Sequence, residues 1–179
     1  MEKKRILYVD RGRPFHRHET LAAQRDRFER SSAVRSALRE NFIVDFYPGL
    51  SIRTLTRLSD SQRRYERENI YSSLVTHFPY DVDFAESEEL KKTKLCGKEL
   101  LKRLYIRSYD LIKKIRKKYP NFPIIAYTGA GEREAEEKNN KMIEILVEAG
   151  FNEIIWKSGN PEQDGIEIRT KLLKLLNKD

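Results

Sequence analysis

Short apolar runs recur along the chain, and each is bounded by charged residues, Pro or Gly. The runs are rich in Ile, Val, Phe and Tyr, which are the residues that strands favour. Near-continuous apolar runs of this length are typical of strands buried on both faces of a sheet. The pattern therefore predicts five strands, at residues 5–10, 41–47, 70–78, 124–128 and 152–157.

Longer segments with apolar residues at helical spacing separate these runs. The clearest is 97–119, where Leu101, Leu104, Leu111 and Ile115 share one face and lysines and arginines surround them. Strands that alternate with amphipathic helices indicate a doubly wound five-stranded parallel sheet with helices on both faces, a three-layer α/β/α arrangement. Such sheets bind ligands at the carboxyl ends of their strands. The predicted helices span 19–40, 51–69, 97–119, 132–149 and 165–177.

The chain has 179 residues, enough for one domain with one sizeable core. We expect a single domain over residues 1–179. It has an extended first-helix region at about 11–40 and an acidic loop insertion at about 80–96. The first helix is predicted to bury a broken apolar stripe that consists of Leu21, Phe28, Ala33, Ala37 and Leu38.

Cysteine content and the amino-terminal pattern bound the cellular setting. A single cysteine, Cys96, excludes an internal disulfide framework and a cysteine-rich zinc site. The first apolar run, residues 6–9, ends at Asp10 and is too short for a signal peptide. No stretch approaches the length of a membrane span. We therefore expect a cytoplasmic protein.

Positive charge is concentrated in one segment. The net charge is +8, and residues 91–123 carry 12 basic and two acidic side chains. Clustered cations attract phosphate backbones or acidic surfaces, so the helix over 98–118 is a candidate surface for nucleic acid or an anionic partner. A solvated helix face is the alternative interpretation, and we favour it slightly. The candidate basic residues are Lys102, Arg103, Arg107, Lys113, Lys114, Lys117 and Lys118.

The second half of the chain carries an ordered set of short motifs. A helix from residue 109 is followed by Phe122-Pro-Ile-Ile-Ala-Tyr-Thr-Gly129, a second helix, Glu148-Ala-Gly-Phe-Asn-Glu-Ile-Ile-Trp-Lys157 and a last helix. This order resembles response-regulator receiver domains, in which a Thr or Ser ends the fourth strand and a Lys ends the fifth. Thr128 and Lys157 match those positions, and Asp10 matches one acid at the end of the family's first strand. The resemblance implies a flavodoxin-like (receiver-like) fold and a role in prokaryotic two-component signal transduction.

The chain departs from this family where phosphoryl chemistry needs particular residues. Receivers are phosphorylated on an Asp that ends the third strand. Alignment on Pro79 places Val75 there, or Thr76 after a one-residue slip. Arg11 replaces the family's second acid. Phosphorylation needs a carboxylate nucleophile and a divalent ion. The resemblance therefore implies a pseudo-receiver that is not an enzyme and holds no metal or cofactor. The predicted strand-end pocket consists of Asp10, Arg11, Thr76, Thr128 and Lys157.

Other residues offer less support for chemistry. Asp81 and Asp83, beyond Pro79, are an alternative to the missing acceptor. His16 and His18 lack a third ligand at metal-site spacing, so a solvated loop is favoured.

Function is therefore expected to lie on the surface. Receivers often dimerise or dock partners through their fourth helix, fifth strand and fifth helix. By resemblance, a protein partner or a second copy of this chain would bind over residues 133–176. The alternative hypothesis is an adaptor that binds nucleic acid or an anionic surface through the basic helix 98–118.

Overall fold

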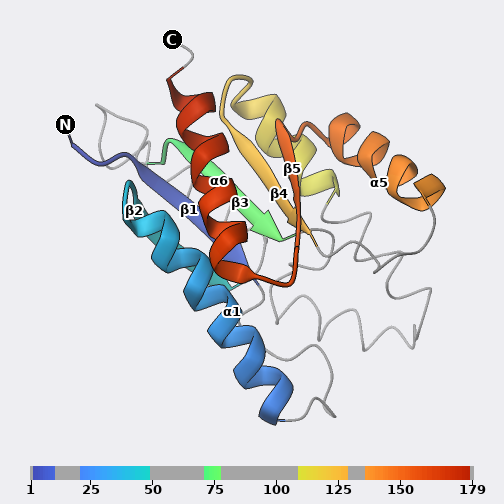
Figure 1. The fold of residues 1–179 in the computed structure, drawn as a ribbon. Coiled ribbons are helices and arrows are strands. Elements are labelled where there is room, and N and C mark those ends of the chain that lie inside the picture. Colours follow the sequence, from blue (N-terminus) through green and yellow to red (C-terminus); the bar gives the residue numbers. More distant parts are fainter. Residues whose placement is uncertain (1, 11–20, 49–70, 78–108, 129–135, 178–179) are drawn as a thin grey trace, which may run out of the picture.

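The computed structural model describes residues 2–10, 21–48, 71–77, 109–128 and 136–177. Five strands form one sheet in the order β2-β1-β3-β4-β5, and every neighbouring pair is parallel (Figure 1). This order confirms the predicted doubly wound, flavodoxin-like sheet. The strands are β1 (Arg5–Asp10), β2 (Ile43–Pro48), β3 (Ser73–His77), β4 (Ile124–Thr128) and β5 (Glu153–Trp156).

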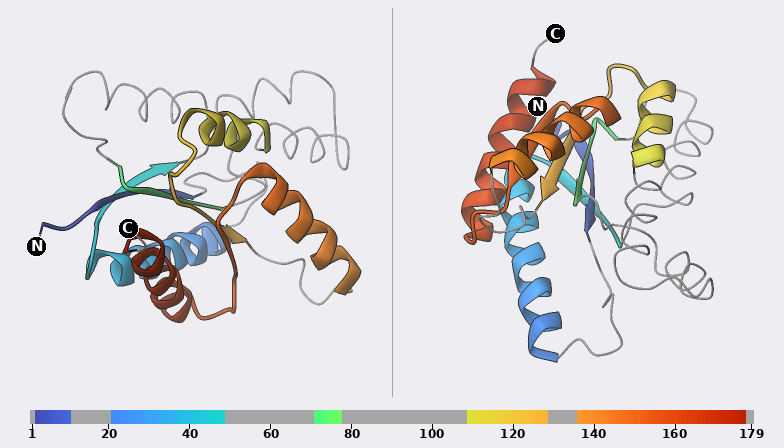
Figure 2. Two further views of the ribbon diagram at one scale, coloured as in Figure 1. Left: turned by 90° about the horizontal axis from the view of Figure 1, so that it is seen from above. Right: turned by 90° about the vertical axis from the view of Figure 1, so that its right-hand side faces the viewer.

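Helices cover both faces of the sheet, as Figure 2 shows. Helices α1 (Leu21–Arg39) and α6 (Pro161–Leu176) pack side by side on one face. Residues 109–118 are helical and lie on the other face, where the end of α5 (Glu136–Ala149) joins the same core. The three-layer α/β/α arrangement is confirmed for the described residues.

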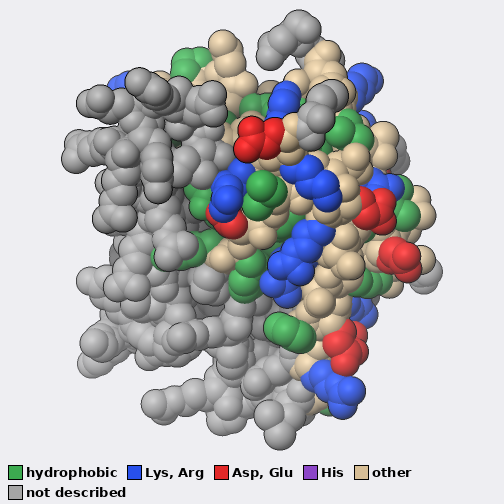
Figure 3. Space-filling model, turned by 90° about the vertical axis from the view of Figure 1, so that its left-hand side faces the viewer, with side chains coloured by type: hydrophobic (Ala, Val, Ile, Leu, Met, Phe, Trp, Pro, Cys, Tyr) green, Lys and Arg blue, Asp and Glu red, His purple; other side chains and the backbone are tan. Residues whose placement is uncertain are grey.

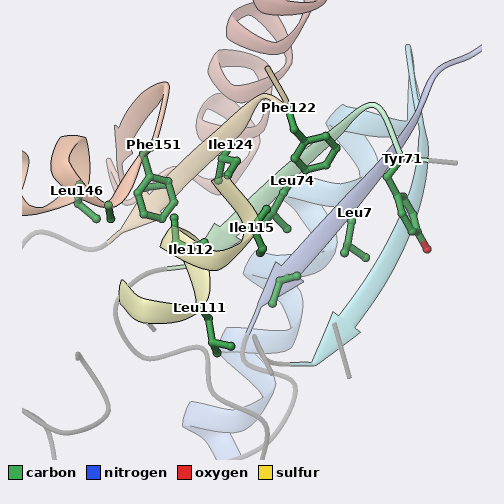
Figure 4. Close-up of a cluster of buried hydrophobic side chains, with 13 residues drawn as sticks. Leu7, Tyr71, Leu74, Leu111, Ile112, Ile115, Phe122, Ile124, Leu146 and Phe151 are labelled. Atoms are coloured by element: carbon green, nitrogen blue, oxygen red, sulfur yellow. The ribbon is translucent and has the colours of Figure 1, made fainter. Parts of the chain in front are cut away.

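The core has two halves, because side chains alternate between the faces of each strand. On one face, Leu7, Leu74 and Ile124 pack against Ile112 and Ile115 of the helical segment 109–118 (Figure 4). On the other face, the neighbouring strand residues pack against α1 and α6. That second cluster includes Ile6, Tyr8, Val75, Ile125, Val34, Leu38, Ile168 and Leu172.

The last helix begins four residues before the predicted start at Gly165. Its side-chain cap is Asn160, whose side-chain oxygen accepts a hydrogen bond from the Gln163 backbone N–H, and Pro161 occupies the first turn. A capping Asn followed by Pro is a strong helix start, because Pro lacks the N–H that a first turn leaves unpaired. Apolar spacing alone could not find this start, since the first turn carries mostly polar residues.

The first helix buries only part of the predicted stripe, and it buries one residue that the stripe did not include. Phe28 is 68% exposed, whereas Val34, absent from the predicted stripe, is fully buried with Leu38 and Ala37. The described core residues of α1 lie in its second half, and Phe28 lies before them.

Several predicted features lie outside the described residues. These are the helix at 51–69, the acidic loop at 80–96 and the basic residues up to Arg107. Among the helices that are described, none combines the length and the apolar character needed to cross a membrane.

Candidate functional site

The carboxyl ends of β1 and β3 bring a carboxylate and an imidazole together. In the register of these parallel strands, Tyr8 pairs with Val75 and Val9 with Thr76, so Asp10 and His77 come next at the same edge. Asp10 is buried, and its Oδ1 lies 3.6 Å from Nδ1 of His77. The other carboxylate oxygen, Oδ2, accepts a 3.1 Å hydrogen bond from the Tyr8 hydroxyl. The Tyr8 hydroxyl thus bonds the Asp10 carboxylate, and the His77 imidazole lies next to it with its Nδ1 beyond hydrogen-bond distance of Oδ1.

A second buried carboxylate lies close by, on α6. Tyr127 of β4 donates a 2.8 Å hydrogen bond to Oδ2 of Asp164. The backbone N–H and hydroxyl of Ser158 both donate to Oδ1 of Asp164, at 3.1 and 2.6 Å. The ammonium group of Lys157 lies 4.9 Å from the centre of the Tyr127 ring, within the range of a cation–π contact. The loop between β5 and α6 is therefore tied to the strand ends.

A small cavity of about 40 Å³ lies beside the two buried carboxylates, Asp10 and Asp164. A space of this size accommodates a water molecule or two and is too small for an organic ligand. Its lining includes Asp10, Arg30, Ser31, Tyr127, Lys157 and Asp164.

Burial changes the acidity of the two phenols at this edge. Burial raises the pKa of Tyr8 well above its ordinary value, and the negative charge of Asp10 raises it further. The pKa of Tyr127 is raised by burial first and then by its hydrogen bond to Asp164. Both phenols therefore remain protonated hydrogen-bond donors at neutral pH.

The predicted strand-end pocket is only partly assembled. Asp10 and Lys157, both assigned to that pocket from the sequence, line the same cavity. Because side chains alternate along a strand, Thr76 lies on the face of Leu74 and Thr128 on the face of Ala126. Both threonines are therefore on one face of the sheet, and Asp10 is on the other. Both threonines are buried, and Arg11 lies outside the described residues.

His77 was not among the predicted pocket residues, yet it is the β3 side chain that contacts Asp10. Alignment on Pro79 pointed to Val75 or Thr76 because it counted back from a proline beyond the strand. The useful signal was the alternation of the strand. Val75 is a core residue of the face that also carries Tyr8, so His77 follows on that face.

The described part of the chain contains no group of three or more His, Cys, Asp or Glu side chains arranged to hold a metal ion. His16, His18, Asp81 and Asp83 lie outside the described residues.

The described end of the basic helix is only partly available to a partner. Lys114, Lys117 and Lys118 are exposed, whereas Lys113 forms a 3.3 Å ion pair with Glu148. The Tyr109 hydroxyl and Lys113 lower the pKa of Glu148. On another face, basic side chains are interspersed with acids in the described region (Figure 3).

Comparisons with known proteins identify the fold. No protein-family model matches the sequence, and no curated protein matches it. A receiver domain protein from Methanospirillum hungatei JF-1 matches with a TM-score of 0.54 and 16% identity, over 99% of this chain and 100% of that one. The phosphorylated cyanobacterial phytochrome response regulator RcpA matches with a TM-score of 0.57 and 9% identity, over 99% and 97%.

A third structure, the receiver domain of an HD domain-containing protein from Pseudomonas fluorescens Pf-5, agrees. It has a TM-score of 0.53 and 14% identity, over 99% of this chain and 100% of that one. Together with the strand order, these likenesses show that the chain has a receiver-like fold. The resemblance inferred from the sequence is confirmed at the level of the fold.

Proposed function

We propose that this chain is a degenerate receiver domain that acts in signal transduction by binding a protein partner, without phosphorylation of an aspartate. The observation that carries the proposal is the contact between His77 and Asp10 at the end of β3. An imidazole takes the place next to Asp10 where a phosphoryl acceptor would need a carboxylate.

The chemistry of the strand ends supports this proposal. Transfer of a phosphoryl group to a receiver requires a carboxylate nucleophile and a divalent ion to neutralise developing charge. Asp10 is engaged by the Tyr8 hydroxyl and by His77. A single carboxylate that accepts a hydrogen bond from a phenol and lies beside an imidazole is a poor magnesium site, because Mg²⁺ favours several oxygen ligands in octahedral geometry.

Incubation with acetyl phosphate and Mg²⁺, followed by intact-mass spectrometry, tests the proposal. We expect no phosphorylated species for the wild-type chain, while a phosphorylatable receiver domain in a parallel reaction gains one phosphoryl group. The variant His77→Asp places a carboxylate beside Asp10 and is expected to gain a phosphoryl group. A phosphorylated aspartate in the wild-type chain, including Asp81 or Asp83, would contradict the proposal.

Surface exposure supports a partner-binding role for the 133–176 face. On α5, Ile143 is 36% exposed and Val147 is 60% exposed, one turn apart on the same side of the helix. Exposed apolar side chains at adjacent positions favour a protein contact. In this proposal the chain is a cytoplasmic prokaryotic binding module and not an enzyme.

The alternative function, binding of nucleic acid or an anionic surface through the helix 98–118, rests on Lys114 and Lys117. Both are exposed in the described part of this helix. Binding to random duplex DNA that weakens steeply with salt, and that is lost in Lys114→Glu/Lys117→Glu, would favour the alternative.

A further inference from the structure

A second cavity lies at the opposite edge of the sheet from Asp10. It is open to solvent and lies where the amino ends of β1, β3 and β4 meet the carboxyl-terminal end of α6. Figure 1 shows these ends of the elements on the side of the molecule where the chain begins. Its volume is about 430 Å³, which lies within the range of small-molecule sites. The lining includes Lys4, Ser72, Lys118, Tyr119, Phe122 and Leu176.

One wall of this cavity is held in place by hydrogen bonds. Arg116 donates to the backbone carbonyl oxygens of Pro120 and Phe122, at 2.6 and 2.9 Å. The Phe122 N–H bonds to the Tyr119 carbonyl, and the Pro123 carbonyl accepts from the backbone of β3. The turn that carries Tyr119 and Phe122 is therefore ordered before any ligand arrives, which lowers the entropic cost of binding.

Positive charge dominates the lining. The Lys4 ammonium donates a 2.9 Å hydrogen bond to the Leu176 carbonyl, which holds it at the rim. The Lys118 ammonium lies 5.3 Å from the centre of the Tyr119 ring. No Asp or Glu is among the residues that line the cavity in the described part of the chain. Among the described lining residues, an anionic group entering here meets two ammonium groups and no carboxylate.

Apolar surface accompanies these charges. Tyr119, Phe122, Leu175 and Leu176 supply aromatic and aliphatic walls between the two lysines. We propose that this cavity binds a small organic anion, a carboxylate, phosphate or sulfonate group carried on a flat apolar body. The anionic group contacts Lys4 and Lys118, and the apolar body packs between the Tyr119 ring and the end of α6.

This inference is independent of the proposed signalling function, because the cavity and the Asp10 cluster share no lining residue. The simpler explanation is that both lysines only neutralise the negative carboxyl-terminal ends of nearby helices. That explanation predicts no saturable binding of an anion. A binding experiment therefore distinguishes it from the proposed anion site.

Titration of the ¹⁵N-labelled chain with naphthalene-1-carboxylate, followed by amide chemical shifts, tests the proposal. We expect saturable shift changes centred on Ser72, Tyr119, Phe122 and Leu176. Naphthalene-1-carboxamide has the same body without the charge and is expected to bind more weakly, by about three-fold or more. Lys4→Gln and Lys118→Gln should each weaken binding of the carboxylate by a similar factor.

Lys117→Gln is the matched control, because Lys117 is an exposed neighbour that does not line the cavity. It should leave binding of the carboxylate unchanged. Absence of saturable shifts, shifts centred elsewhere, equal binding of the carboxamide, or equal weakening by Lys117→Gln would each overturn the proposal.

Discussion

At the scale of single residues, Tyr8 combines full burial with a hydrogen bond to a buried carboxylate. It has the largest of the fully buried side chains, and its hydroxyl donates to a buried carboxylate. Tyr8 and Asp10 are two positions apart on one strand, so they face the same side of the sheet. Burial and the charge of Asp10 oppose ionisation of the phenol.

This arrangement predicts a loss of stability at high pH. A tyrosine in the unfolded chain has a pKa of about 10, whereas the folded protein retains the Tyr8 proton well above that value. The contribution to stability is thus fully present below pH 10 or so and is lost as the pH rises further. The free energy of unfolding should fall by up to about 1.4 kcal/mol per pH unit for each proton retained.

Urea unfolding between about pH 8 and pH 11, from about two units below the unfolded pKa to about one unit above it, measures this slope. Tyr8→Phe should show a smaller slope above pH 10 or so than the wild-type chain. Ile6→Val is the control, since it alters the same buried cluster without changing an ionisable group. An unchanged slope in Tyr8→Phe would show that the phenol is not shielded in this way.

The same residues show how far sequence reasoning reaches at this scale. Asp10 and Lys157 could be predicted as neighbours, because each ends a parallel strand and such ends meet at one edge. The contact of His77 with Asp10 could not be predicted from the sequence, since it depends on the register of β1 against β3. A short apolar run does not specify register when both faces are buried.

At the scale of elements, the packing of α1 on α6 depends on a glycine. Gly165 is buried in α6, and a Cβ built there would lie 2.8 Å from the Cβ of Ala37 and 3.0 Å from the Cα of Val34. The two helices therefore approach more closely at this point than any larger residue allows.

Gly165→Ala should destabilise the protein by about 1 kcal/mol, the middle of a range of about 0 to 2 kcal/mol. Overpacking costs about 1–3 kcal/mol, and the better helix propensity of Ala returns at most about 1 kcal/mol. Thermal or urea unfolding measures the change. Glu167→Ala, at an exposed position of the same helix, should change stability by no more than about 0.5 kcal/mol. A Gly165→Ala variant as stable as the wild type would rule out the close contact.

Element boundaries were harder to predict than the elements themselves. The strands β1 and β4 lie where their apolar runs predicted them. The start of α6 depends on the hydrogen bond from Gln163 to Asn160, a polar signal that apolar periodicity does not contain. Likewise, the exposure of Phe28 follows from how much of α1 the sheet and α6 cover.

At the scale of the whole molecule, the two sheet edges differ in chemistry. The carboxyl edge holds buried carboxylates and phenols around a small cavity. The amino edge opens a larger cavity lined by lysines and apolar side chains. Alternation of strands and helices predicted the sheet, and hence which residues end the strands, but not the shape of either edge.

The partner-binding face gives a prediction for the whole molecule. If a second copy of this chain binds over 133–176, the exposed Ile143 and Val147 lie in that contact. Replacing both with Glu would then place charges in an apolar interface, which disfavours association. Val147 is 60% exposed, so Val147→Glu should change the stability of the monomer by no more than about 0.5 kcal/mol. Ile143 is 36% exposed, so Ile143→Glu should cost more, roughly 1 kcal/mol.

Sedimentation equilibrium at roughly 100 µM, a concentration that populates dimers with micromolar dissociation constants, compares the variants. We expect the wild-type chain to self-associate and Ile143→Glu/Val147→Glu to be monomeric. Glu144→Gln, an exposed position on the same helix, serves as the control and should associate like the wild type, because it adds no charge. A monomeric wild-type chain would contradict the homodimer, and self-association that survives the double substitution would place the contact on another face. In either case Ile143 and Val147 would be candidates for contact with a different protein. Binding of that protein to the same variants would test this.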